Sequence, residues 1–210
     1  MLSSITPQAP HSLTAGSFRR RSKTRLELDV WTISTGIAVS ALRQYGNVLS
    51  REHREAVQAL ADLFTAVTFG AVGGRYAAAL PTGAGKTMSA VAFIVALSRM
   101  DRPESVAVCA EKVQQLITFK RELVLWGVPE ERIGLWYADD YLTPEGKKPS
   151  EPSTTEPETK QFLLLTHART RGRTELAKMN TYHGEPRSLW LYDESLLASH
   201  RTSPSILVPS

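Results

Sequence analysis

The sequence predicts an α/β fold in which helices cover both faces of a parallel β-sheet. Short apolar segments alternate with longer segments that carry apolar residues at helical spacing, and this alternation is typical of such sheets. A glycine-rich turn joins one of the predicted strands to the helix that follows it. With 210 residues, the chain is long enough for one domain with a substantial core.

The composition is that of a soluble globular protein, with 42% hydrophobic and 22% charged residues. No apolar segment approaches the roughly 20 residues of a membrane span, so no membrane partner is expected. The single cysteine, Cys109, lies in an apolar segment, which favours a buried thiol in a reducing compartment, and we expect a cytoplasmic protein. The net charge of +4 permits a nucleic-acid partner without requiring one.

The N-terminal 26 residues contain no acidic residue and five basic ones between Arg19 and Arg25. An organellar transit peptide has this composition, and so does a disordered basic arm, which we favour for residues 1–26. No compact apolar segment precedes a small-residue cleavage site, so secretion is not expected.

The remaining elements follow from hydrophobic spacing and from turn residues. We expect helices over 27–45, from Ser50 to Gly70, over 88–99 and over 111–126. We expect strands over 76–80, 105–109, 133–137, 162–166 and 188–192. Residues 142–160 are rich in Pro, Glu, Ser and Thr, which predicts a flexible surface loop between two strands.

Residues 79–87, Ala-Leu-Pro-Thr-Gly-Ala-Gly-Lys-Thr, lie between a predicted strand and a predicted helix. Glycines let the backbone turn tightly beside a ligand, and a helix N-terminus attracts anions, so this segment predicts a phosphate-binding loop. A lysine reaches the β- and γ-phosphates and a Thr hydroxyl binds Mg²⁺ in such loops. The expected nucleotide-binding residues are Pro81, Thr82, Gly83, Ala84, Gly85, Lys86 and Thr87. The alternative is an ordinary strand-to-helix turn with an exposed lysine.

The last predicted strand ends at Asp193-Glu194. We expect this strand beside the phosphate-loop strand, because ligands of open α/β sheets bind at the carboxyl ends of the strands. Asp193 would then hold Mg²⁺, and Glu194 would orient and deprotonate the attacking water. The alternative is a surface acid pair that caps a strand.

Residues 49–196 resemble the first RecA-like domain of superfamily 2 helicases and translocases, of the DEAD/DEAH or restriction type. Residues 80–87 resemble motif I, and Leu191-Tyr192-Asp193-Glu194-Ser195-Leu196 resembles motif II. The resemblance implies a P-loop NTPase domain over 27–196 with a C-terminal tail over 197–210. It also implies ATP and Mg²⁺ as cofactors and a nucleic-acid partner, DNA in preference to RNA.

Three further segments are similar to the family more weakly. Residues 106–112 are placed as motif Ia. Residues 164–169 are placed as the strand and loop that touch the nucleic-acid backbone, which implies contacts by Thr166 and Arg169. Residues 49–57 are placed as the upstream adenine-reading segment, with His53 where the family has Gln.

The departures from the family qualify these expectations. An amide can donate one hydrogen bond and accept another at the same base edge, whereas an imidazole makes only one of the two. With His53 in place of Gln, the sequence therefore does not predict whether the site selects adenine. Leu196 and Ala110 replace the usual motif II and motif Ia residues. The sequence contains no motif III and no second RecA-like domain with its arginine finger. The resemblance therefore implies a second domain supplied elsewhere and slow turnover by this chain alone.

Two classes of function remain open at the level of the sequence. One is an ATP-dependent motor domain that remodels nucleic acid. The other is a nucleotide-binding module without useful turnover, and a DNA-packaging type of ATPase is a further alternative. Among the remaining residues, we expect His167, His183 and His200 on the surface. We expect Trp126, Trp136 and Trp190 in the core.

Overall fold

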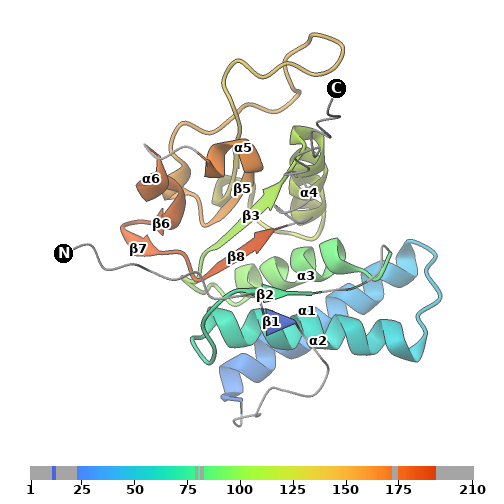
Figure 1. Ribbon diagram of the computed structural model, residues 1–210. Coiled ribbons are helices and arrows are strands. Elements are labelled where there is room, and N and C mark those ends of the chain that lie inside the picture. Colours follow the sequence, from blue (N-terminus) through green and yellow to red (C-terminus); the bar gives the residue numbers. More distant parts are fainter. Residues whose placement is uncertain (1–10, 13–22, 79, 81–82, 172–174, 193–210) are drawn as a thin grey trace, which may run out of the picture. The chain divides into compact units, whose positions relative to one another are not determined.

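The computed structural model describes residues 11–12, 23–78, 80, 83–171 and 175–192. The chain divides into two compact units (Figure 1). The helical unit comprises Met1–Glu104 with Leu125–Val128. The sheet unit comprises Ser105–Val124 with Pro129–Ser210.

Three helices form the helical unit: α1 (Arg25–Gln44), α2 (Arg51–Thr68) and α3 (Lys86–Arg99). Thr24 and Glu27 form a reciprocal capping box at the start of α1, in which the Glu27 N–H donates to Thr24 Oγ1 over 3.3 Å. The Ser50 side chain accepts a hydrogen bond from the His53 N–H at the start of α2. These caps begin the helices close to the residues that the sequence indicated.

The helix after the glycine-rich turn, α3, is the centre of the helical unit. Every residue from Ser89 to Ser98 is buried, and both α1 and α2 pack against this helix. The rings of Phe64 in α2 and Phe93 in α3 meet edge to face with their centroids 5.5 Å apart. Apolar burial on all sides therefore fixes α3, and with it the end of the helix that meets the glycine-rich turn.

The strand before the glycine-rich turn differs from the prediction. Among the described residues of 76–80, only Tyr76–Ala77 (β2) is a strand, and it pairs in parallel with His11–Ser12 (β1), inside the segment expected to be a disordered arm. The expected pairing of this strand with the 188–192 strand is not among the pairings of the described residues. The Leu80 N–H donates to the Ala78 carbonyl over 2.9 Å.

Four parallel strands form the sheet of the other unit, in the order β4-β5-β3-β8. They are β3 (Val106–Ala110), β4 (Ile133–Trp136), β5 (Phe162–Thr166) and β8 (Leu189–Tyr192). The register aligns Cys109 of β3 with Leu165 of β5 and with Tyr192 of β8. This sheet confirms the α/β class and four of the five predicted strands.

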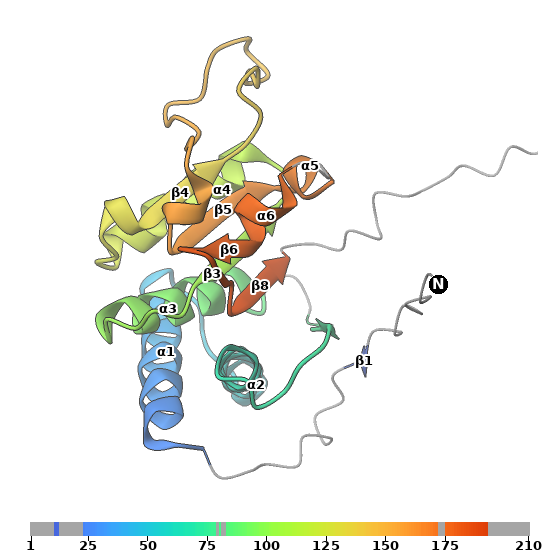
Figure 2. The same cartoon turned by 90° about the vertical axis from the view of Figure 1, so that its left-hand side faces the viewer.

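Helices flank both faces of this sheet (Figures 1 and 2). On one side lies α4 (Val113–Leu125), which buries Leu116, Ile117 and Leu123. On the other side Met179 of α6 (Leu176–Asn180) packs in one buried cluster with residues from three strands, and Trp190 packs against it. The cluster comprises Ala107, Cys109, Trp136, Leu163, Leu165 and Met179. Burial raises the pKa of the Cys109 thiol, as expected for an inert core cysteine.

The segment between β5 and β8 holds short elements that the sequence did not indicate. After α5 (His167–Thr170) and α6, strands β6 (Thr181–Tyr182) and β7 (Glu185–Pro186) form an antiparallel hairpin. The buried Arg187 guanidinium donates to the carbonyls of Met179, Gln161 and Pro157 over 2.8, 3.1 and 2.8 Å. Burial lowers the pKa of Arg187 to about 10. One side chain thus joins α6, the start of β5 and the short 3₁₀ helix Pro157–Thr159.

Residues 142–160 form a connection in which the 3₁₀ helix Pro157–Thr159 is the one regular element. Part of the connection is bonded to β4, the edge strand of the sheet. The Thr154 N–H donates to the Leu135 carbonyl over 2.6 Å, and Ser153 Oγ bonds both the N–H and the carbonyl of Tyr137. These bonds cover an edge that would otherwise expose unpaired backbone groups.

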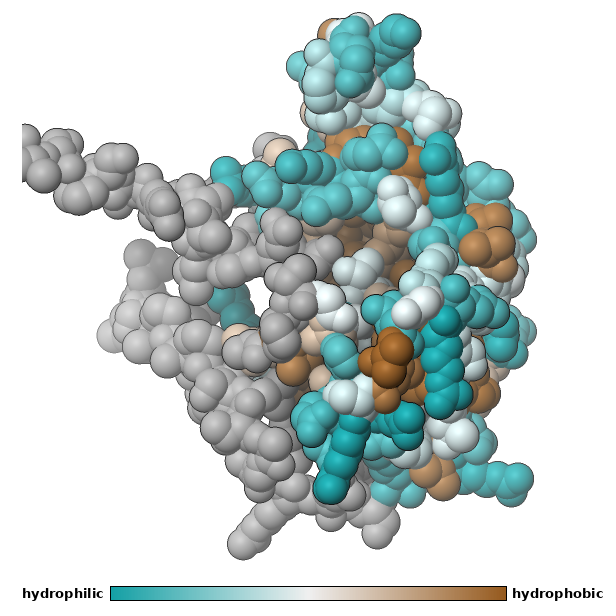
Figure 3. Space-filling view, turned by 90° about the vertical axis from the view of Figure 1, so that its right-hand side faces the viewer, coloured by the Kyte–Doolittle hydropathy of each residue, from teal (hydrophilic) through white to brown (hydrophobic). Residues whose placement is uncertain are grey.

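The large apolar side chains at the surface are dispersed over several elements. On the face drawn in Figure 3, hydrophobic residues stand as separate spots among hydrophilic ones. The exposed members of this set are Leu28, Tyr45, Val48, Val124, Leu125, Leu142 and Tyr192. Within the described residues, no helix has both the length and the apolar character that crossing a membrane requires.

Candidate nucleotide-binding site

The glycine-rich turn ends in a left-handed residue that starts α3. Gly85 has φ +85° and is the N-cap of α3, and Gly83 before it has φ +83°. No side chain among the described residues caps this helix, and its first turn contains no acidic residue. The positive end of the α3 dipole is therefore uncompensated by the helix itself, which suits a bound anion such as phosphate.

Two helices hold this turn in place. A Cβ built on Gly85 would lie 2.9 Å from Cδ1 of Leu42 in α1 and 3.7 Å from Cγ2 of Val57 in α2. A Cβ on Gly83 would meet nothing within 4 Å. Gly85 is thus required for both its backbone conformation and its lack of a side chain, whereas Gly83 is required for its conformation alone.

The lysine of the turn bonds back to the start of the loop. Lys86 Nζ donates to the Leu80 carbonyl over 2.7 Å, so the ammonium closes the segment from Leu80 to Lys86. Lys86 is half-buried, Ala84 is buried and Thr87 is exposed. Pro81 and Thr82 lie outside the described residues. Of the predicted nucleotide-binding residues, Gly83 to Gly85 lie in the turn, and Lys86 and Thr87 begin α3 directly after it.

His53 belongs to the same unit and lies one helical turn before Val57 on α2. Residues four apart share a helix face, so His53 is on the side of α2 that approaches the phosphate loop. Its Nδ1 is buried and has no hydrogen-bond partner among the described residues. An imidazole nitrogen in this position can bond to one atom of a ligand.

The predicted nucleic-acid residues lie at the carboxyl end of β5, in the sheet unit. Thr166 ends β5 and is buried. The Arg169 guanidinium donates to the Tyr137 carbonyl over 2.8 Å and to Glu175 over 2.9 Å, and it lies over the Trp136 ring. These contacts give Arg169 a role within the sheet unit, and a phosphate contact would have to compete with them. Asp193 and Glu194 lie outside the described residues.

The expectation that His167 is a surface residue is wrong. His167 follows Thr166 directly, is 8% exposed, and has a buried Nε2 without a partner among the described residues. Its ring lies 6.3 Å from that of Tyr192, the last residue of β8. The spacing of residues in the sequence does not predict that His167 is buried. Its contact with Tyr192 forms between the ends of β5 and β8, which are far apart in the chain. Among the tryptophans expected in the core, Trp136 is buried.

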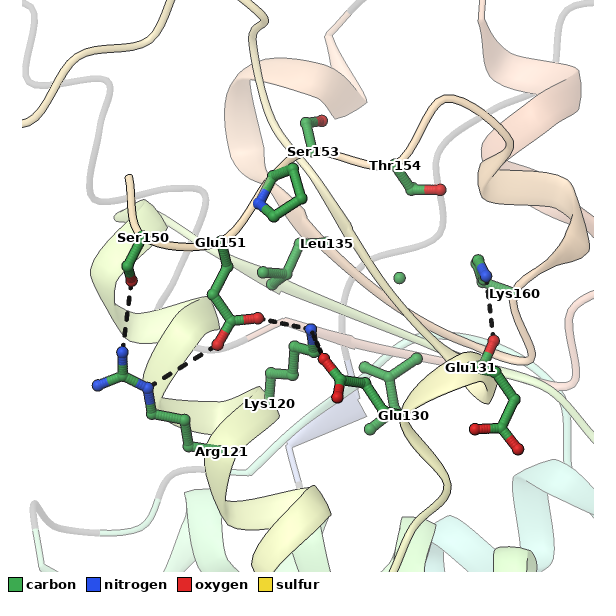
Figure 4. Close-up of a pocket in the computed structure, with 13 residues that line it drawn as sticks. Lys120, Arg121, Glu130, Glu131, Leu135, Ser150, Glu151, Ser153, Thr154 and Lys160 are labelled. Carbon is green, nitrogen blue, oxygen red and sulfur yellow. Dashed lines mark hydrogen bonds and ion pairs between the residues drawn. The ribbon is translucent and has the colours of Figure 1, made fainter. Parts of the chain in front are cut away.

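A pocket of about 530 Å³ lies beside the edge strand β4 (Figure 4). Within it, Lys120 Nζ donates to Glu130 over 2.6 Å and to Glu151 over 2.5 Å. Burial alone would lower the pKa of Lys120, but these two carboxylates outweigh it and raise the pKa. The ammonium is thus neutralised inside the protein, and the pocket joins the 142–160 connection to α4. Its charge balance does not suit a polyphosphate.

Comparison of the chain with known protein families, curated proteins and solved structures found no match. Among the described residues, no group of three or more His, Cys, Asp or Glu side chains could hold a metal ion. An Mg²⁺ bound beside this turn would need the Thr87 hydroxyl, phosphate oxygens and water as ligands. The described part of the loop fits such a group because Thr87 is exposed next to the α3 N-terminus.

Proposed function

We propose that this chain is the ATP-binding, Mg²⁺-dependent ATPase domain of a nucleic-acid helicase or translocase with a RecA-like fold. The observation that carries the proposal is the turn from Gly83 to Thr87. This turn places the left-handed Gly85 at the N-terminus of α3, which no side chain among the described residues caps. It also places the Lys86 ammonium across the loop, on the Leu80 carbonyl. The parallel sheet of the other unit supports the proposal, because this fold presents its ligand-binding residues at the carboxyl ends of such strands.

In the proposed function, the residues of the phosphate loop divide the work of binding. The backbone N–H groups at the start of α3 hold the phosphates, and Gly85 lets the backbone approach them. On binding, the Lys86 ammonium leaves the Leu80 carbonyl and donates to oxygens of the β- and γ-phosphates. Its acceptor is then charged and no longer neutral, which makes the hydrogen bond stronger. Thr87 and Asp193 would hold Mg²⁺, which would supply positive charge beside the phosphates, and Glu194 would orient the attacking water.

His53 is the proposed contact to the base. Its unpaired Nδ1 makes one hydrogen bond to the base edge, whereas an amide makes two. We therefore expect wild type to prefer ATP over GTP only weakly, and His53→Gln to raise that preference. The preference is measured as the ratio of the dissociation constants for GTP and ATP analogues, in wild type and in His53→Gln. The same ratio in both proteins would contradict the base contact.

The test of the proposed function is equilibrium binding of a fluorescent ATP analogue with and without Mg²⁺. We expect Lys86→Ala to weaken binding by tenfold or more, which is about 1.4 kcal/mol. Lys147→Ala, which removes an exposed lysine of the 142–160 connection, is the matched control and should bind as wild type. Glu194→Gln should bind the nucleotide and lose turnover. A folded wild-type chain, verified by circular dichroism, that shows no Mg²⁺-dependent binding would refute the proposal.

A further inference from the structure

The outer edge of β4 is covered by a segment of the same chain, Ser150–Thr154, which we call the edge segment. The Thr154 N–H donates to the Leu135 carbonyl over 2.6 Å, as the N–H of a neighbouring strand would. One residue earlier, Ser153 Oγ accepts from the Tyr137 N–H over 3.1 Å and donates to the Tyr137 carbonyl over 3.0 Å. The edge segment therefore runs antiparallel to β4.

The edge segment is an imperfect strand because of its proline. Since Thr154 pairs with Leu135, the residue opposite Tyr137 in a regular antiparallel ladder is two positions before Thr154. That residue is Pro152, which has no N–H to donate to the Tyr137 carbonyl. The Ser153 hydroxyl makes both bonds to Tyr137 instead. A segment with another residue in place of Pro152 would make these two bonds from its backbone.

Two basic side chains of α4 hold the acidic residue of the edge segment (Figure 4). Lys120 Nζ donates to one oxygen of the Glu151 carboxylate over 2.5 Å, and Arg121 Nε lies 3.9 Å from the other oxygen. The Tyr137 hydroxyl donates to the Glu151 carbonyl. The Glu151 side chain is only 20% exposed as a result. The edge of β4 thus has a defined place for one carboxylate beside the positions where a strand pairs.

The edge segment does not fill the groove in which it lies. The pocket of about 530 Å³ remains beside it, and Ile133, Leu135 and Pro152 contribute apolar side chains to the lining. Ligand pockets of proteins have volumes of about 300–1,000 Å³, so this space is sufficient for side chains of a partner. Apart from Pro152, the edge segment carries only polar residues. Few apolar contacts hold it in place, and such segments have low local stability.

We propose that the edge of β4 is a docking site for an extended acidic segment of a partner protein. In this site, the partner segment pairs antiparallel with Leu135 and Tyr137 by β-strand addition. It places a carboxylate against Lys120 and Arg121 and carries an apolar residue directly after the acidic one, where the pocket has room. The edge segment is then an internal substitute that the partner displaces. The site lies within the sheet unit and does not depend on nucleotide binding.

The probe is a fluorescent peptide with the sequence of residues 148–156 and the substitution Pro152→Val. Fluorescence anisotropy measures its binding to the full chain. In wild type the tethered edge segment competes with the peptide, which raises the apparent dissociation constant. The chain variant Ser153→Ala loses both bonds to Tyr137 and should bind the peptide about tenfold more tightly. The chain variant Thr155→Ala, which loses an exposed hydroxyl of the same connection, is the matched control and should bind as wild type.

Two further peptides test what the site recognises. The peptide that retains Pro152 should bind several-fold more weakly, since it lacks the backbone donor to Tyr137. The valine peptide with Glu151→Gln should bind about tenfold more weakly, because it loses a charged acceptor. That second loss should be smaller when the chain carries Lys120→Met, since the two groups interact directly.

The valine peptide decides the outcome. If it does not bind to a folded Ser153→Ala chain, the edge of β4 serves its own segment alone and the inference is overturned. Equal binding of all three peptides would also overturn it, as would a gain in affinity for Thr155→Ala as large as that for Ser153→Ala. Circular dichroism verifies that each variant is folded. The chain variant Glu151→Gln, which releases the edge segment from Lys120, provides the same test if Ser153→Ala does not fold.

Discussion

The two glycines of the turn before α3 provide a test of how the helical unit holds this turn. Gly83 and Gly85 have nearly the same φ, +83° and +85°, so an alanine at either position pays about 1–2 kcal/mol for the left-handed conformation. In both variants, alanine also lowers the conformational entropy of the unfolded chain, which stabilises the folded state by roughly 0.4–1 kcal/mol. The net loss of about 1 kcal/mol should be the whole effect of Gly83→Ala, because its Cβ would meet no atom.

Gly85→Ala has an additional cost, because its Cβ would lie 2.9 Å from Cδ1 of the buried Leu42. Overpacking of this kind costs about 1–3 kcal/mol, so Gly85→Ala should lose that much more stability than Gly83→Ala. Urea unfolding followed by circular dichroism measures both losses. Equal losses for the two variants would refute the close approach of Leu42 to Gly85.

A double-mutant cycle with Leu42→Val makes the test specific to this contact. Leu42→Val alone should cost roughly 0.5–1.5 kcal/mol, by comparison with similar losses of one methylene group. In the Gly85→Ala background it should cost about 1 kcal/mol less, because the shorter side chain relieves the clash. With Gly83→Ala the two losses should add. Additivity in both cycles would show that Leu42 does not restrict Gly85.

Three other predictions concern the sheet unit. Arg187→Met should destabilise the chain by about 3 kcal/mol in urea unfolding, since three carbonyls lose a charged donor, and Arg187→Lys should recover part of that loss. Gly134→Ala should cost about 1–3 kcal/mol in the same assay, because its Cβ would lie 3.0 Å from Cβ of Lys160; no loss would contradict this contact. Lys120 lowers the pKa of Glu130, so the pair stabilises the fold while Glu130 is ionised. The loss of stability caused by Lys120→Met should therefore be greatest above about pH 4.3, the ordinary pKa of a Glu side chain. That difference should shrink as the pH falls through the lowered pKa of Glu130, and a pH-independent difference would contradict the pairing.

Much of the local structure could be predicted from the sequence because its causes are local. The caps at Thr24 and Ser50 and the apolar spacing of α1 and α2 depend on residues three or four positions apart. The strand β5 has the predicted bounds because its residues form one continuous apolar segment, as expected for a strand that is buried on both faces. The glycine-rich turn at the start of α3 likewise depends on residues adjacent in the chain.

The tertiary structure alone decided the features that depend on distant residues. The pairing of β2 with β1 joins residues more than 60 positions apart, and no local pattern marks His11–Ser12 as a strand. In the sequence, Arg187 and Arg169 look like ordinary surface cations. The structure shows that Arg187 donates to backbone carbonyls and that Arg169 donates to the Glu175 carboxylate. His167 is buried because two strand ends meet across β3, and sequence spacing does not encode that juxtaposition. The sequence by itself determined the four long helices and the glycine-rich turn before α3, whereas burial and partner choice depend on which distant segments share one core.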